Sequence, residues 1–134
     1  MHVTRKVSIK TIVTEDFKKE LDTELKAALE RVNASAQRLQ FQMDAYVPEL
    51  AKTDMNQAMQ VRRAMEAERQ KFDDLKKEIN SRLEAAKTLG LGSEYDQGEI
   101  ESVVELKPGD NFDEKVDKAE IVLKDGKVQE IRGD

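Results

Sequence analysis

Two long runs of apolar residues at helical spacing constrain the fold of this chain more than any other feature. In the first run, apolar positions recur from residue 17 to residue 50 at a mean spacing of about 3.67 residues, close to the α-helical period. The second run covers residues 55–89 and ends beside Gly90, a residue type that often terminates helices. The pattern predicts two helices of roughly 32 residues, each with one apolar face and a length on the order of 48 Å.

Pro48 interrupts the pattern between the two runs. A proline inside a helix removes a backbone hydrogen bond and clashes with the preceding turn, at a cost of ~3 kcal/mol. We therefore expect an antiparallel helical hairpin over residues 15–89 with its tip near residues 47–54, where Thr53 or Asp54 caps the second helix. The alternative is a helix that is kinked at Pro48, continues for one turn and reverses near Thr53.

The two ends of the chain carry strand patterns. Residues 1–14 contain "VTRKVSIKTIV", which alternates with period two and is rich in β-branched residues. Residues 90–134 contain a strand candidate over residues 100–107 and the segment "AEIVLKDGKVQEIR", in which Asp125–Gly126 predicts a tight β-hairpin. We expect residues 3–13 and 99–132 to form a small sheet or barrel from which the coiled-coil-like hairpin projects, an α+β fold.

Charge favours the pairing of these two ends. Residues 1–14 carry three basic and no acidic side chains, whereas residues 90–134 carry six basic and thirteen acidic ones. Opposite charges on neighbouring strands stabilise a sheet.

The composition argues against several classes of function. The chain has no cysteine, no signal-peptide-like N-terminus and no apolar run of membrane-spanning length, so we expect a soluble cytoplasmic protein that does not contact a membrane. His2, the one histidine, lies at the terminus, and the motifs of serine hydrolases, P-loop proteins and zinc proteases do not occur. We therefore expect no catalytic residue and no cofactor.

An acidic segment, "GDNFDEKVD", is a weak candidate for a Ca²⁺ or Mg²⁺ site, because both ions prefer oxygen ligands. The spacing does not fit the EF-hand loop, and a solvated acidic loop is the favoured interpretation. Its oxygen-bearing side chains belong to Asp110, Asn111, Asp113, Glu114 and Asp117.

A second candidate surface is basic. The second predicted helix carries six basic residues that could contact nucleic acid, and acidic residues are interleaved with them around its polar faces. No aromatic platform for single-stranded bases accompanies them. The residues are Arg62, Arg63, Arg69, Lys71, Lys76 and Lys77.

The tip of the hairpin is the third candidate. Its apolar residues either close the end of the hairpin or form a contact site for a second copy or another protein. They are Tyr46, Val47, Leu50, Met55 and Met59. Met43, Met59 and Met65 have the spacing of residues in the seam between the helices. Each helix has more apolar residues than one neighbour can cover, since Phe41, Met43 and Tyr46 cannot all face the same helix. We therefore expect self-association, either through the hairpins or through the edges of the sheet.

With these segments placed, the chain resembles the YlqD family of small bacterial proteins. The resemblance covers nearly the whole chain, through "VSIKTIVTEDFK", "RLQFQMD", "LGLGSEYDQGEIESVVELKPGDNFDE" and "AEIVLKDGKVQEIR". It implies a loose link to RNA or ribosome maturation, through gene neighbours in some relatives, and it implies no catalytic residue. The leading hypothesis is a non-enzymatic interaction or scaffold module acting through its helical hairpin. The alternative is an RNA- or ribosome-associated factor that uses the basic second helix.

Overall fold

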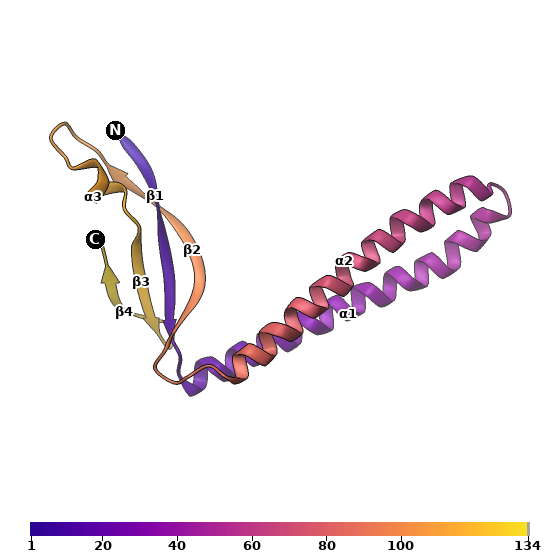
Figure 1. Cartoon of the computed structure of the whole chain (residues 1–134), viewed down its shortest axis with the longest axis horizontal. Helices are drawn as coiled ribbons and strands as arrows, with labels where there is room; N and C mark the ends of the chain where they lie inside the picture. The colour runs from indigo at the N-terminus through magenta and orange to yellow at the C-terminus, as the bar shows by residue number, and fades with distance from the viewer. Residues whose placement is uncertain (134) are drawn as a thin grey trace. The chain divides into compact units, whose positions relative to one another are not determined.

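The computed structural model describes residues 1–133 and contains a four-stranded sheet and a long helical hairpin (Figure 1). The chain divides into two compact units. The sheet unit comprises residues 1–19 and the segment from residue 89 onward, and the hairpin unit comprises residues 20–88. The α+β fold with a helical hairpin is confirmed. The elements are β1 (His2–Ile12), α1 (Glu15–Ala51), α2 (Met55–Lys87), β2 (Glu94–Glu105), α3 (Phe112–Val116), β3 (Ala119–Lys124) and β4 (Lys127–Arg132).

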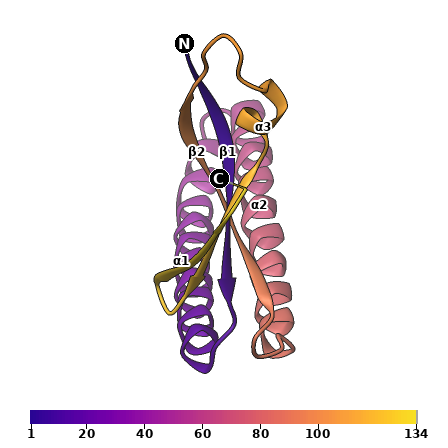
Figure 2. The ribbon, with the colours of Figure 1, turned by 90° about the vertical axis from the view of Figure 1, so that its left-hand side faces the viewer.

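The sheet is open and has the strand order β2-β1-β3-β4, so of the two predicted forms, a small sheet or a barrel, the structure contains the sheet. The N-terminal strand β1 lies in the middle, antiparallel to β2 and parallel to β3, while β4 returns antiparallel to β3. β2 begins six residues earlier than the predicted strand because it pairs with the whole length of β1. Figure 2 shows the strong twist of these four strands.

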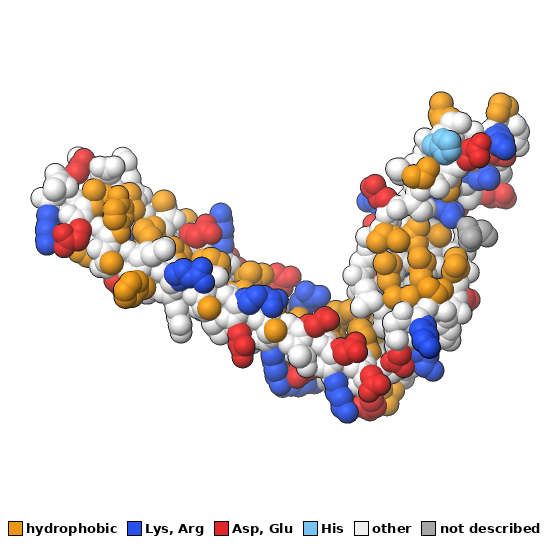
Figure 3. Space-filling view, turned by 180° about the vertical axis from the view of Figure 1, so that it is seen from behind, with side chains coloured by type: hydrophobic (Ala, Val, Ile, Leu, Met, Phe, Trp, Pro, Cys, Tyr) orange, Lys and Arg blue, Asp and Glu red, His pale blue; other side chains and the backbone are white. Residues whose placement is uncertain are grey.

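The register separates the sheet into an apolar face and a charged face. Val7 pairs with Ile100 and Ile9 pairs with Ile121, which also pairs with Ile131, so these residues share one face. Figure 3 shows hydrophobic side chains gathered over this unit. On the other face, Lys6 and Lys10 of β1 form ion pairs with acidic residues of β2 at 3.8 and 3.3 Å, as the opposite charges of the two ends predict.

The two predicted glycine turns have different outcomes. Asp125 and Gly126 have φ values of 48° and 82°, and the hairpin that they predict joins β3 to β4. Gly90, by contrast, is not the residue that takes a left-handed conformation after α2. Thr88 caps this helix, and its hydroxyl donates to the Ala85 carbonyl at 2.9 Å.

The start of α1 is fixed within the sheet unit. Thr14 accepts a hydrogen bond from the Phe17 amide at 3.1 Å and donates one to the Asp125 carboxylate at 2.6 Å. The Phe17 ring contacts the ring of Tyr95 on β2, with centroids 5.3 Å apart. The hydroxyl therefore caps the helix and connects it to the β3–β4 turn.

The two long helices lie side by side in both ribbon views (Figures 1 and 2). Most of the predicted apolar stripe of α1 is buried or half-buried, with Tyr46 exposed, and on α2 the residues Ala58 and Ile79 are buried. The buried stripe of α1 consists of Phe17, Leu21, Leu25, Val32, Ala36 and Met43.

Pro48 lies inside α1, so the turn is shorter than the predicted tip at residues 47–54. The alternative prediction, a helix that continues past Pro48 and reverses near Thr53, describes the structure. The helix continues to Ala51, and the amides of Thr53 and Asp54 then donate to the Leu50 carbonyl at 3.1 and 2.9 Å. Pro48 is close to the helix end, so its missing N–H affects only the last turn. The extra turn keeps Leu50 at the seam spacing, where it is half-buried.

Candidate functional site: the distal end of the hairpin

The turn between the long helices is held by local hydrogen bonds. Asp54 is the N-cap of α2, and its carboxylate accepts from the Gln57 amide at 3.0 Å. The Thr53 hydroxyl donates to the Leu50 carbonyl at 3.1 Å. These hydrogen bonds hold the backbone of the turn, and the apolar side chains next to it take no part in them.

The predicted tip residues fall into two groups. Tyr46, Met55 and Met59 are 52%, 61% and 48% exposed. Val47 and Leu50 are half-buried. The exposed group is therefore the part of the predicted site that another molecule can reach.

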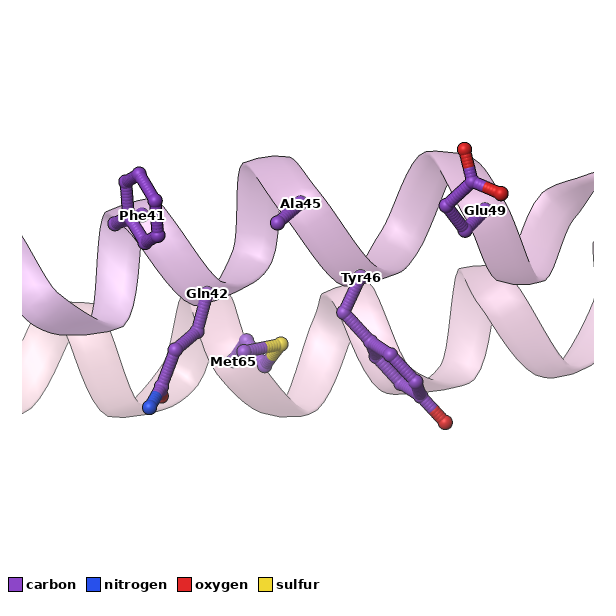
Figure 4. Close-up of a pocket in the computed structure, with 6 residues that line it drawn as sticks. All are labelled: Phe41, Gln42, Ala45, Tyr46, Glu49 and Met65. Carbon is purple, nitrogen blue, oxygen red and sulfur yellow. The ribbon is translucent and has the colours of Figure 1, made fainter.

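The structure adds a groove beside this tip, shown in Figure 4. The groove has a volume of about 580 Å³, and all but one of its lining residues belong to α1. Figure 4 shows the Phe41 ring and Glu49 on one side, Tyr46 and Gln42 on the other, and Met65 of α2 below. We call the set Phe41, Gln42, Ala45, Tyr46, Glu49 and Met65 the distal groove.

The spacing of the lining residues explains why they form a groove. Phe41, Ala45 and Glu49 follow one another at intervals of four, so they lie along one line of the helix. Ala45 is the smallest of the three and leaves the space between the two larger side chains. Phe41 is 76% exposed, an unusually open position for an aromatic ring.

Among the predicted sites, only Tyr46 belongs to the distal groove. Ala45 and Glu49 were missed because they lie outside the seam pattern, and Phe41 was identified only as an apolar residue that one neighbour cannot cover, not as part of a site. Their interval of four residues within an otherwise polar face was the signal that could have identified them. Of the three methionines assigned to the seam, Met43 is 6% exposed, Met65 is half-buried in the groove, and Met59 is largely exposed.

The structure brings two of the basic candidates together. Arg62 and Arg69 line a smaller depression of about 200 Å³ with Gln40, Asp44 and Pro48. Arg62 forms an ion pair with Glu66 at 3.3 Å, and Arg69 donates to the Gln40 side chain at 3.3 Å.

The other basic candidates are dispersed along α2. Arg63 is exposed, Lys76 is half-buried, and Lys71 lies 3.6 Å from Glu68. Figure 3 shows basic and acidic side chains alternating along the hairpin. The described residues of α2 therefore do not form a stripe of one charge.

We expected the acidic candidates to lie in an open loop. In the structure, the short helix α3 forms within this segment. Asn111 caps this short helix and accepts from the Glu114 amide at 3.2 Å, while the Asp110 carboxylate accepts from the Lys107 amide at 2.9 Å. Asp113 and Glu114 lie in the first turn of α3, and Asp117 follows its last residue. Across residues 1–133, the structure contains no group of three His, Asp or Glu side chains arranged to hold a metal ion.

The charged face of the sheet holds two carboxylates with lowered pKa values. A hydrogen bond from Arg132 lowers the pKa of Glu94, and a hydrogen bond from the Gly98 amide lowers that of Asp96. Hydrogen bonds to the carboxylates of Glu94 and Glu130 raise the pKa of Arg132. Two ion pairs of these carboxylates, Arg132–Glu94 and Lys10–Asp96, join different strands within the sheet unit.

Within the described chain, neither long helix has a segment apolar enough to cross a membrane. His2 lies on β1, opposite Glu105 of β2. Its side chain is exposed.

Comparisons with known proteins agree on the family and on the fold. A family model described as "YlqD protein" matches residues 1–132. A relative from Bacillus subtilis (strain 168), described as "Uncharacterized protein YlqD", is 30% identical over 132 residues, which cover 98% of each chain. A crystal structure of a protein of unknown function from Synechococcus sp. WH 8102 is 21% identical, with a TM-score of 0.88 over 98% of this chain and 94% of the other. This last likeness concerns the fold.

Proposed function

The chain belongs to the YlqD family, and we propose that it is a non-enzymatic interaction or scaffold module that binds protein partners through the distal end of its helical hairpin. The binding surface consists of the distal groove and the exposed tip residues next to it.

One observation carries this proposal: the distal groove is an apolar depression on a regular helix, with the Phe41 ring 76% exposed at its rim. Leaving such surface in water is unfavourable by roughly 25 cal/mol for each Å². Exposed aromatic and methionine side chains around a groove are typical of surfaces that receive an apolar side chain or helix from a partner.

The tip residues extend the same surface toward the turn. Met55 and Met59 are both about half exposed or more, and methionine adapts its shape to different partners. The hydrogen bonds of Thr53 and Asp54 hold the turn without them. Partner contact therefore accounts for their exposure.

The experiment is an affinity capture with the full chain from a lysate of the organism that makes it, with and without ribonuclease. We expect a protein partner that survives ribonuclease and is lost with Tyr46→Asp plus Met55→Asp. Both positions are more than half exposed, so circular dichroism should show unchanged helicity. Ala64→Asp, at an exposed alanine of α2 outside the groove, is the matched control. Capture that survives the paired substitution would overturn the proposal.

The same experiment tests an RNA- or ribosome-associated factor that uses Arg62, Arg63, Arg69 and Lys76. That function requires capture that ribonuclease abolishes, that weakens steeply with salt and that falls with Arg62→Ala plus Arg63→Ala. Ribonuclease-insensitive capture would count against it.

A further inference from the structure

We infer that the apolar face of the sheet packs against the same face of a second copy of this chain, so that the two sheets form a sandwich about a two-fold axis. This surface lies in the sheet unit, so it is separate from the distal groove and goes beyond the proposed function. The centre of the apolar face consists of Val7, Ile9, Ile100, Ile121, Val128 and Ile131.

The apolar face is open to solvent. A sheet buries its apolar face against a second layer of structure. The described residues form a single sheet, and α3, which contacts β1, has only five residues. Ile100, Val128 and Ile131 are 47%, 60% and 56% exposed, and Figure 3 shows hydrophobic side chains gathered over this unit. Contiguous apolar surface of this kind marks an interface with another molecule.

The charge distribution allows this face to pack against itself. A two-fold axis sets a surface against its own copy, so a charge at the centre would meet a like charge. Among the described strand residues that the register places on this face, Arg5 is the one charged residue. Arg5 lies beyond the end of the β1–β3 pairing, and its guanidinium donates to the Ser102 hydroxyl and the Gly133 carbonyl, both at 3.4 Å. The uncharged centre therefore opposes no like charge.

The shape of the sheet favours a second copy as the occupant. Two sheets pack face to face, about 10 Å apart and with strands aligned to within about 30°, when their twists are alike. Figure 2 shows a strongly twisted sheet, and a second copy has the same twist. The centre of the face is built from valine and isoleucine side chains, which interdigitate between packed sheets.

The area is sufficient for a dimer. The four strands have 11, 12, 6 and 6 residues. With about 3.3 Å per residue and 4.8 Å between strands, the face covers about 550 Å² in projection. Its accessible surface is larger because the side chains project from it. A standard interface buries roughly 600–1,000 Å² of each partner, so the face can support a dimer without the hairpins.

The edge of the sheet is a poorer surface for self-association. β2, the longer edge strand, contains five acidic residues and no basic one, and its bulge at Gly98 interrupts the pairing register. Like charges on neighbouring strands and bulges both disfavour pairing between edges. The acidic residues are Glu94, Asp96, Glu99, Glu101 and Glu105.

The test compares the same substitution on the two faces of β2. Ile100 lies on the apolar face and Val103 on the charged face, and they are 47% and 64% exposed. Sedimentation equilibrium of the full chain, from low micromolar to several hundred micromolar, measures the dissociation constant of Ile100→Lys and of Val103→Lys. We expect a dimer whose dissociation constant rises at least about tenfold with Ile100→Lys, because an ammonium group from each copy would be buried against apolar side chains. Val103→Lys should leave it unchanged.

A second variant keeps the test independent of one position. Val128→Lys places the charge on β4, at a side chain that is 60% exposed, and should weaken the dimer in the same way. Circular dichroism of each variant checks that the monomer remains folded.

Three results would overturn the inference. The first is a chain that stays monomeric over the whole concentration range. The second is a dimer that Ile100→Lys and Val128→Lys leave intact, which would place the interface on the hairpins. The third is equal weakening by Val103→Lys, which would indicate pairing through the edge of β2. Each result leaves the proposed function to its own test, since capture that depends on Tyr46 and Met55 is measured separately.

Discussion

The guanidinium of Arg132 lies 2.7 Å from the carboxylate of Glu94, and this ion pair joins the last residue of β4 to the first residue of β2. These are the two edge strands of the sheet. A flat four-stranded sheet would hold its edges well apart, because neighbouring strands are about 4.8 Å apart. Side chains of the two edge strands therefore meet at one end of the sheet, as its strong twist allows. The two edge strands β2 and β4 therefore share no backbone pairing, and a side-chain ion pair joins them at one end.

We expect this ion pair to make stability depend on pH. The folded protein holds the pKa of Glu94 below its ordinary value of 4.5. The ionised carboxylate thus favours the folded state above about pH 4.5, and this contribution is lost as the pH falls through the lower folded pKa. Glu94→Gln should lower the urea concentration at the midpoint of unfolding at neutral pH. Below about pH 5, the midpoint of this variant should change less with pH than the midpoint of the wild type.

The control for this prediction is Val103→Thr on the same strand, an exposed position at which no charge changes. An unchanged pH profile for Glu94→Gln would contradict the role of the edge-to-edge pair. Ionic strength gives a second check, since exposed ion pairs weaken as salt is added.

Much of the fold could be predicted from the sequence because local rules and tertiary packing agree. The period of α1, the N-cap at Thr14 and the turn at Asp125–Gly126 each follow from residues close together in the chain. The choice between an open sheet and a barrel could not be made from the sequence. Whether β2 and β4 exchange backbone hydrogen bonds depends on the curl of the sheet, and no short stretch of sequence encodes that curl.

The candidate site was harder to predict than the fold. Tyr46 and Met55 could be predicted because both belong to the apolar pattern next to the turn, whereas Phe41 lies on the opposite side of α1 from that pattern. Its one signal is the interval of four residues that relates it to Ala45 and Glu49, which is too short to stand out on an otherwise polar face. Only the structure shows that Phe41 and Met65, on different helices, border the same groove.

Pro48 should cost the hairpin stability. Within α1 it cannot donate the amide hydrogen bond that would reach the carbonyl of Asp44. We expect Pro48→Ala to raise the free energy of unfolding by up to about 3 kcal/mol, less if the helix end already frays. Urea unfolding followed by circular dichroism measures this change. Gln37→Ala, at an exposed position of the same helix, is the control. A Pro48→Ala protein no more stable than this control would mean that the last turn does not limit hairpin stability.

Asp54 should contribute through its side chain at the N-terminus of α2. Its carboxylate accepts the Gln57 amide at 3.0 Å, so Asp54→Ala leaves that donor without its partner. The expected loss is about 1 kcal/mol of unfolding free energy, while Asp54→Ser should keep most of it because serine caps as well. Equal losses for alanine and serine would show that the capping bond is not the source of the effect.

Two glycines provide a matched test of the β3–β4 turn. Gly126 has a φ of 82°, where a residue with a Cβ is strained, whereas Gly90 has no such φ, and neither has another atom within 4 Å of an added Cβ. Gly126→Ala should therefore lower the free energy of unfolding by about 1–2 kcal/mol through backbone strain alone. Gly90→Ala should be neutral or slightly stabilising, because it restricts the unfolded chain without straining the folded one. Thermal unfolding of both variants under the same conditions measures the difference. Similar melting temperatures for the two variants would mean that the turn relaxes to another type and that Asp125 and Gly126 do not fix the register of β4.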